Sequence, residues 1–199
     1  MCSVVKVVLS AKYRDAFRPC LEALARFVAV HPNWITLTGV VLAGISAYYY
    51  ARADWVAGSV VAALAALVDA VDGAVARYWK KESKWGAYLD AMSDRVVEGI
   101  ILFGIGWGSG LWPQVYIIML ASFLISYAKA RAAMEINVDN VDWPDLFERA
   151  ERLALIVAGV PIAAQFRDGL FWYLTVLAFA FLFVGVTQRV HRVWRRMRE

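Results

Sequence analysis

Long apolar stretches dominate this sequence and set the strongest limit on its fold. Of the 199 residues, 61% are hydrophobic, and the mean hydropathy is +0.54. A helix needs roughly 20 mostly apolar residues to cross the hydrocarbon core of a bilayer. Six such stretches occur, at approximately Trp34–Tyr50, Trp55–Trp79, Ala91–Trp107, Trp112–Met134, Leu153–Phe166 and Leu170–Val190. The sequence therefore predicts an all-α integral membrane protein with six transmembrane helices. Because the fifth stretch is short, five spans remain the alternative.

The segment before the first apolar stretch has a different pattern. Between residues 11 and 30, Phe17, Leu21, Leu24 and Val28 recur at helical spacing, and charged residues fill another face. Such a helix is expected to lie in the membrane interface rather than cross the bilayer. The sequence contains no linker or composition shift that would separate a second domain. We therefore predict one membrane domain over 1–199, with an amphipathic helix at 11–30 and a helix bundle at 34–190.

Positive charge is distributed unequally between alternate connections. The N-terminal segment, the connections after the second and fourth stretches, and the C-terminal tail hold all of the 21 Lys and Arg residues except Arg52 and Arg167. Cytoplasmic connections of membrane proteins are rich in Lys and Arg. We therefore expect a multi-pass protein of the cell membrane with both termini in the cytoplasm. Loops facing anionic lipid headgroups explain the basic excess, so no nucleic-acid partner is expected.

Aspartates interrupt the second and third apolar stretches on the predicted cytoplasmic side. Asp69 and Asp72 are three residues apart, and Asp90 and Asp94 are four apart, so each pair projects from one helix face. The connection Tyr78–Trp85 is short, which predicts that the two helices are antiparallel neighbours with all of these carboxylates converging. Charged residues within membrane helices are costly and usually functional. The cluster is therefore a candidate active site.

The residue types around the aspartates favour metal-dependent chemistry on a phosphate ester. Dense oxygen ligands suit hard cations such as Mg²⁺, Mn²⁺ or Ca²⁺. A pair of such ions about 3.5–4 Å apart stabilises displacement at phosphorus. Gly73 and Gly86 would let a bulky ligand approach the backbone closely, and Arg77, one turn beyond Gly73, could meet a phosphate.

The full pattern, Asp69-x2-Asp72-Gly73-x2-Ala76-Arg77-x8-Gly86-x3-Asp90-x3-Asp94, resembles the signature of the CDP-alcohol phosphotransferase family. That resemblance implies two divalent cations, Mg²⁺ or Mn²⁺, held by Asp69, Asp72, Asp90 and Asp94. It also implies that Asp94 is the general base. The CDP-lipid would contact Asp69, Gly73, Arg77 and Gly86, and also Asn33 and Thr36, because Pro32-Asn33-x2-Thr36 is similar to the family's entry into its first span. A homodimer is implied by the resemblance alone.

Three cations are candidates for binding the acceptor alcohol. Lys129, Arg149 and Arg189 fall at the predicted cytoplasmic ends of the last three helices. They are either flanking charges or a pocket for an acceptor that carries phosphate, since Arg suits bidentate phosphate contacts. The segments Ser126–Ala132 and Glu148–Arg152 resemble phosphatidylinositol phosphate and archaetidylinositol phosphate synthases. This resemblance implies inositol 1-phosphate as acceptor and CDP-diacylglycerol or CDP-archaeol as donor, with glycerol 3-phosphate as the alternative acceptor.

A membrane cation transporter is the alternative of another class, because transporters also place carboxylates in membrane helices. Their sites usually lie near the bilayer midplane in broken helices. Here the acids lie toward one membrane face, beside Arg77, Lys80, Lys81 and Lys84. Basic neighbours suit a phosphate substrate and hinder a cation pathway, so the sequence favours the phosphotransferase.

Overall fold

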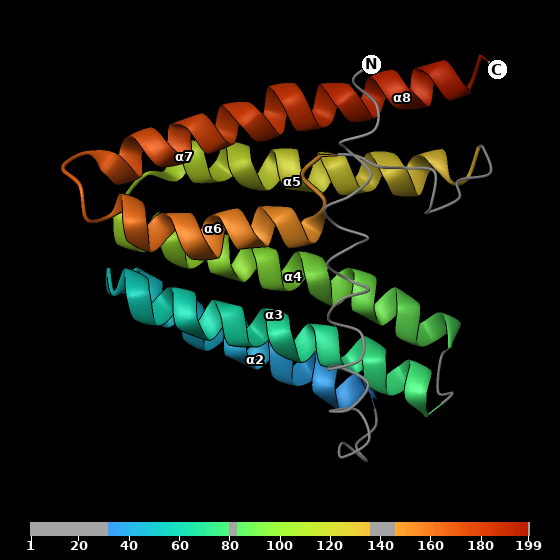
Figure 1. The fold of residues 1–199 in the computed structure, drawn as a ribbon, viewed down its shortest axis with the longest axis horizontal. Coiled ribbons are helices and arrows are strands. Elements are labelled where there is room, and N and C mark those ends of the chain that lie inside the picture. The colour runs from blue at the N-terminus through green and yellow to red at the C-terminus, as the bar shows by residue number, and fades with distance from the viewer. Residues whose placement is uncertain (1–31, 80–82, 136–145, 199) are drawn as a thin grey trace, which may run out of the picture.

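The structure, a computed structural model, describes residues 32–79, 83–135 and 146–198 (Figure 1). All regular secondary structure in these ranges is helical, which confirms the all-α prediction for the described residues. The predicted amphipathic helix at 11–30 lies outside them. The helices, in chain order, are α2 (Pro32–Ala51), α3 (Trp55–Tyr78), α4 (Lys84–Ser109), α5 (Trp112–Ala132), α6 (Arg149–Ala163), α7 (Gly169–Phe179), the π-helix η1 (Ala180–Val186) and α8 (Thr187–Arg196).

Within the described ranges, four helical segments are long and apolar enough to cross a bilayer: Trp34–Ala51, Trp55–Tyr78, Trp112–Ala132 and Gly169–Arg196. The last of these is the continuous rod formed by α7, η1 and α8. Helix α4 carries Asp94, Arg95 and Glu98 within its length, and α6 has only 15 residues. The charges of α4 and the short length of α6 keep these two helices from meeting the length and hydropathy expected of a transmembrane helix. The membrane character of the chain is thus confirmed, and the count of six spans is not.

The helices lie side by side along the long axis of the molecule (Figure 1). Helix α2 packs against both α3 and α4, while α3 also contacts α6. Helix α5 packs against α4 and against the rod α7–η1–α8. The two aspartate helices were predicted to be antiparallel neighbours, and the structure shows in addition that α2 is the main packing partner of both. They remain antiparallel, and their charged ends lie at the same end of the bundle.

Close backbone contact explains why α4 packs on α2. A Cβ atom on Gly104 would lie 2.5 Å from the Cα of Ala47, and one on Gly108 would lie 1.9 Å from the carbonyl oxygen of Tyr50. Small residues four apart allow membrane helices to approach in this way, since lipid supplies little hydrophobic force between helices. The contact lies in the half of α4 away from its aspartates, so the site end of α4 is left open for other partners.

Polar caps set the beginnings of the two aspartate helices. The side chain of Asp54 accepts a hydrogen bond from the Ala57 amide at 3.1 Å and starts α3. The hydroxyl of Ser83 accepts one from the Gly86 amide at 2.9 Å and starts α4. Each cap satisfies a helix N–H group that has no partner within its own helix. These caps place the acids at defined depths from the helix ends.

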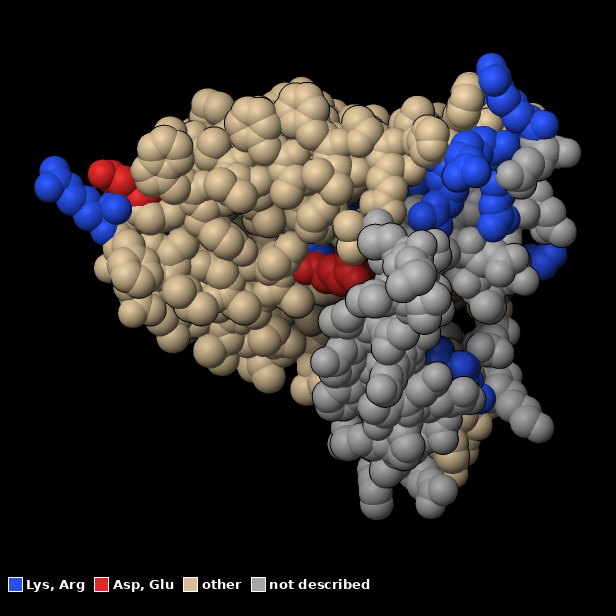
Figure 2. Space-filling model, turned by 45° about the horizontal axis from the view of Figure 1, so that its top comes forward, with Lys and Arg blue, Asp and Glu red and all other residues tan. Residues whose placement is uncertain are grey.

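Apolar side chains occupy both the interior and the outside of the bundle. Ile101, Leu102, Ile105 and Ile118 are fully buried, while large residues such as Phe103 are exposed. In Figure 2 most of the visible surface carries no Lys or Arg, and these residues gather mainly at one end, which includes the basic helix α8. An apolar body with charge at its ends is the distribution expected of a protein surrounded by lipid.

The Gly104 contact makes a direct prediction about stability. Gly104→Ala forces a methyl group against the backbone of α2, and overpacking of this kind typically costs about 1–3 kcal/mol. The matched control is Gly44→Ala on α2, where a Cβ would meet nothing within 4 Å. Thermal unfolding in detergent should show a lower Tm for Gly104→Ala only. Equal Tm values for the two variants would contradict the close packing of α2 and α4.

Candidate metal and substrate site

Asp72 is the most enclosed of the predicted site residues on α3. Its exposed fraction is 5%, and its Oδ2 accepts a hydrogen bond of 2.7 Å from the hydroxyl of Thr36, in the first turns of α2. Asp69 lies one turn earlier on the same face and is half-buried. A carboxylate that accepts one hydrogen bond keeps further lone pairs available. Thr36 therefore orients Asp72 while leaving it able to bind a cation.

The structure brings three of the four predicted carboxylates into one group. Oxygen atoms of Asp69, Asp72 and Asp90 all lie within 4.8 Å of one another. Oxygens on opposite sides of a bound Mg²⁺ or Ca²⁺ ion are about 4–5 Å apart. The spacing and the hard oxygen donors both fit a divalent cation. Helices α3 and α4 thus each supply ligands to the same place.

Asp94 joins this group through a cation rather than by direct contact. The Nη1 atom of Arg149 lies 2.5 Å from Oδ2 of Asp69 and 2.5 Å from Oδ1 of Asp94. The Nη2 atom of Arg149 also donates to Oδ1 of Asp69 at 3.2 Å. One guanidinium therefore links the acids of α3 and α4 from the first turn of α6.

The Oδ1 atom of Asp94 has a distinct environment. It is buried and accepts no hydrogen bond from the residues that the structure describes, although Arg149 lies close to it. The other oxygen, Oδ2, lies 3.4 Å from Nη2 of Arg95. Asp94 is therefore held between two guanidinium groups at the edge of the carboxylate cluster.

The predicted nucleotide contacts lie around the ends of α3 and α4. Arg77 is exposed in the last turn of α3, and its Nη1 would lie 3.4 Å from a Cβ built on Gly73. A Cβ on Gly86 would lie 3.1 Å from the capping hydroxyl of Ser83. The missing side chains thus keep space beside the acids and also allow the α4 cap to form. The side chain of Asn33 lies outside the described residues.

The three predicted acceptor cations have different positions. Of these, Arg149 is seen in ion pairs with the aspartates. Arg189 is buried on α8, and Lys129 is half-buried in the last turn of α5. A buried cation in a membrane bundle is costly and usually functional. Arg149 and Arg189 are thus both enclosed by the bundle, and Arg149 contacts the acids.

A buried ion pair next to Arg149 was not assigned by the sequence analysis. The Nε and Nη2 atoms of Arg152 donate to the two oxygens of Glu98 at 2.9 and 3.0 Å. Arg95 donates to the hydroxyl of Ser126 on α5. The available signal was Glu98 itself, an acid one turn after Asp94 within an otherwise apolar stretch. Its partner on α6 is far away in the chain, so sequence spacing could not identify it.

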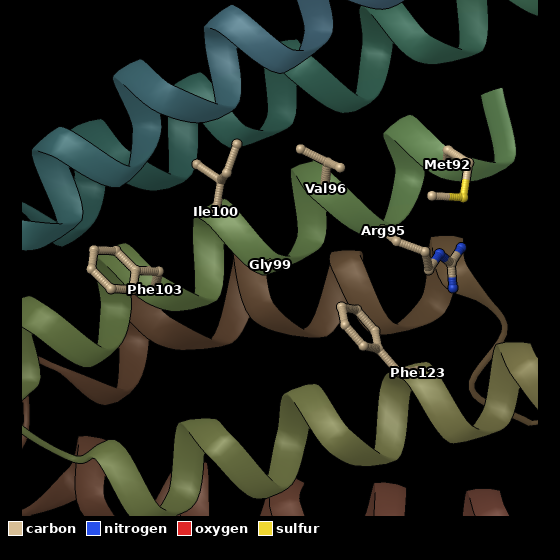
Figure 3. A pocket seen from close by; sticks show the side chains of 7 residues that line it. All are labelled: Met92, Arg95, Val96, Gly99, Ile100, Phe103 and Phe123. Atoms are coloured by element: carbon tan, nitrogen blue, oxygen red, sulfur yellow. The ribbon is translucent and has the colours of Figure 1, made fainter. Parts of the chain in front are cut away.

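An apolar pocket of about 430 Å³ lies between α4 and α5 (Figure 3). Arg95 stands among its otherwise apolar lining, which consists of Met92, Val96, Gly99, Ile100, Phe103 and Phe123. At 100° per residue, these α4 positions fall on a different face from Asp90 and Asp94. The pocket therefore opens on another face of α4, and Arg95 belongs both to its lining and to the contact with Asp94.

The fold and the site together define a class. This is a helical membrane protein with a group of carboxylates that could hold a metal ion at one end of its bundle. Residues 29–185 match the model of the CDP-alcohol phosphatidyltransferase family, and the chain belongs to that family. It is therefore a transferase, and family membership removes the support for the cation-transporter alternative.

Characterised relatives cover nearly the whole chain. An archaetidylinositol phosphate synthase of Methanothermobacter thermautotrophicus is 30% identical over 189 residues, which are 94% of this chain and 95% of the relative. A phosphatidylinositol phosphate synthase of Mycobacteroides abscessus is 36% identical over 190 residues, or 88% of this chain and 82% of the relative. The similarity thus extends well beyond the aspartate pattern.

Solved structures of a similar synthase have a similar fold. The phosphatidylinositol phosphate synthase of Mycobacterium tuberculosis with CDP-DAG bound superposes with a TM-score of 0.76 at 28% identity, covering 87% of this chain and 93% of that one. The same synthase in complex with manganese and citrate gives a TM-score of 0.74 at 29% identity, with 88% of each chain covered.

The contact between Thr36 and Asp72 predicts an effect on metal affinity. Groups that orient a metal ligand typically contribute 10–100-fold to metal affinity. Thr36→Val should therefore weaken Mn²⁺ binding about tenfold or more, as measured by the loss of the free-ion electron paramagnetic resonance signal. Thr38→Val is the matched control, because the Thr38 hydroxyl bonds to the Trp34 carbonyl within the same helix. Equal Mn²⁺ affinity in both variants would count against a cation site at Asp72.

Proposed function

We propose that this protein transfers the lipid-phosphate group of a CDP-lipid to inositol 1-phosphate and releases CMP. The donor is CDP-diacylglycerol or CDP-archaeol, and the product is phosphatidyl- or archaetidylinositol phosphate. The observation that carries the proposal is the position of Arg149 on Asp69 and Asp94, because it joins a phosphate-binding side chain to the carboxylate cluster. The names of the similar synthases support the choice of acceptor.

Asp69, Asp72, Asp90 and Asp94 would hold two divalent cations, Mg²⁺ or Mn²⁺. When bound, such ions supply Lewis-acid stabilisation of the charge that develops on a pyrophosphate. The grouping of three of these carboxylates within 4.8 Å supports the assignment. The manganese in the solved relative agrees with it.

Asp94 is the proposed general base. The buried Oδ1 of Asp94 takes the proton from the attacking hydroxyl of the acceptor. The acceptor oxygen then forms a bond to the phosphorus that carries the lipid, and the bond from that phosphorus to the CMP oxygen breaks. CMP leaves with the electron pair of that bond. Positioning and charge neutralisation supply most of the catalysis in reactions of this kind.

The CDP-lipid would bind along the ends of α2, α3 and α4. Asp69, Gly73, Arg77 and Gly86 are proposed to contact it, together with Asn33 and Thr36. The position of the Arg77 guanidinium beside Gly73 supports a phosphate contact next to an open stretch of backbone.

Arg149, Lys129 and Arg189 are proposed to bind the phosphate of the acceptor. Their contributions come from α6, α5 and α8, so the acceptor would approach from the side of the bundle opposite α2. Glycerol 3-phosphate also carries a phosphate that such cations could bind, and it is the alternative acceptor.

The remaining proposals concern the membrane. Helix α4 has 26 residues, about 39 Å at 1.5 Å per residue, which is sufficient to cross a bilayer despite its charges. With α4 as a fifth span and the shorter α6 as a sixth, we propose six spans within one domain over 1–199, preceded by an interfacial helix at 11–30. The basic end of the bundle, with both termini and the site, is proposed to face the cytoplasm of the cell membrane. A homodimer is expected from the family resemblance.

The acceptor is tested by CMP release from purified protein in lipid nanodiscs with Mg²⁺. CDP-diacylglycerol and CDP-archaeol are each offered with inositol 1-phosphate, glycerol 3-phosphate or free inositol. We expect release with inositol 1-phosphate and its loss on metal chelation. Release with glycerol 3-phosphate alone would replace the acceptor and keep the reaction type, and release with free inositol alone would remove the need for a phosphate pocket.

Asp94→Asn tests the general base. The variant keeps the shape of the side chain but cannot accept the proton, so kcat should fall by about 10²–10⁴-fold, while CDP-lipid still binds. Single-turnover CMP release and CDP-lipid binding are measured on the same sample. Asp54→Asn is the control, because Asn caps a helix as well as Asp does and Asp54 lies at the other end of α3. Near-normal turnover by Asp94→Asn would show that another group removes the proton.

A further inference from the structure

The ion pair between Glu98 and Arg152 lies deep in the bundle. Their exposed fractions are 3% and 1%, and both oxygens of Glu98 accept from Arg152. Burying two charges costs several kcal/mol per ion, and replacing such a pair by apolar residues is often neutral or stabilising. Stability alone therefore gives little reason for this pair to exist.

The pair also controls the backbone at the start of α6. The Nη1 atom of Arg152 donates to the carbonyl oxygen of Phe147 at 2.8 Å, and the amide of Phe147 donates to Oε2 of Glu151 at 2.7 Å. Phe147 has a φ of 63°, a left-handed conformation that is unusual for a residue with a side chain. Such a conformation persists only where its surroundings hold it, and the two α6 side chains do so.

Phe147 is further fixed by packing. Its ring lies 5.0 Å from that of Phe181, between ring centres, which attaches the entry to α6 to the C-terminal rod. The Arg152 guanidinium also reaches the hydroxyl of Ser126 at 3.5 Å, which lies on α5. The beginning of α6 is therefore held by α4, α5 and the C-terminal rod at once.

Arg149 lies one turn before Arg152 on α6, so both side chains are placed by the same few residues. We infer that the Glu98–Arg152 pair positions Arg149 over Asp69 and Asp94 and thereby sets the affinity for the acceptor phosphate. Glu98 and Arg152 are positioning residues in this inference, because neither touches the reacting atoms. The inference rests on the proposed function, which assigns the acceptor phosphate to Arg149.

Rigid placement is needed for a physical reason. An arginine has many rotamers, and ordering its side chain costs conformational entropy. A helix start that is already fixed keeps the guanidinium close to its binding geometry before the acceptor arrives. Misplacement of a substrate-binding group by about 1 Å can cost roughly 10²-fold in rate. A loose α6 start should therefore weaken acceptor binding with little effect on the CDP-lipid.

The test uses the double variant Glu98→Leu/Arg152→Met, which replaces the pair by apolar side chains. We expect a Tm close to that of the wild type, a KM for inositol 1-phosphate raised about tenfold or more, and a KM for CDP-lipid changed less than about twofold. Arg152→Lys keeps the charge but cannot make the bidentate contact and the Phe147 contact together. It should shift the acceptor KM in the same direction, and it decides the question if the double variant does not fold.

Arg131→Gln is the matched control. It breaks an ion pair of 2.6 Å with Glu135 that is half exposed to solvent, so both KM values should stay at their wild-type levels. An unchanged acceptor KM in a stable double variant would overturn the inference and leave the pair a purely structural contact. An equal rise of both KM values would overturn it as well, because it would indicate general disruption of the site.

A mutant cycle tests whether the effect passes through Arg149. In an Arg149→Gln background, removing the Glu98–Arg152 pair should add little to the acceptor KM, since coupled residues are strongly non-additive. Full additivity would overturn the inference. Failure of the proposed function is visible separately, because the wild-type enzyme would then not release CMP with inositol 1-phosphate. If glycerol 3-phosphate were used instead, the same KM comparison made with that acceptor would decide the role of the pair.

Discussion

Carboxylates on α3 and α4 repel one another within a helix bundle, and cationic groups are needed to hold them together. Asp69 and Asp94 share the guanidinium of Arg149, and Asp69, Asp72 and Asp90 lie at a spacing that fits a divalent ion. Because bringing these carboxylates together is electrostatically costly, cationic groups have to lie beside them. Attraction between acids and cations connects helices that are distant in sequence, and the rest of the site is arranged around it.

Helix packing places this cluster away from the tightest part of the bundle. Gly104 and Gly108 bring α4 against α2 in one half of the molecule, and the aspartates lie toward the other half. Because α2 packs on both aspartate helices, α3 and α4 can each present acids to a shared space without packing closely on one another. The contacts of α2 with α3 and α4 thus hold the bundle together and also leave space between the aspartates of these two helices.

Much of the fold could be predicted from the sequence because membrane helices are read from composition and length. The aspartate pattern indicated the site for the same reason, since a charge in an apolar stretch is conspicuous. The packing of α2 against both aspartate helices was missed. The glycines of α4 are visible in the sequence, but the sequence does not show which neighbouring helix packs against them. The Glu98–Arg152 pair was also missed, since its partners are far apart in the chain and sequence spacing does not show that they meet. Two of the six expected spans were not confirmed, because α4 carries charges and α6 is short.

The π-helix η1 determines which way the end of the last rod faces. Leu174 and Leu177 are buried on α7, Phe181 and Gly185 are buried within η1, and Arg189 is buried on α8, four residues after Gly185. In a regular α-helix every fourth residue turns a further 40° around the axis. The wider π-helical stretch offsets part of that rotation, so Arg189 stays on the face that Phe181 begins. A helical wheel drawn with one period through the whole rod would instead turn this arginine about 80° away from Phe181, and its burial beside that residue would not be evident.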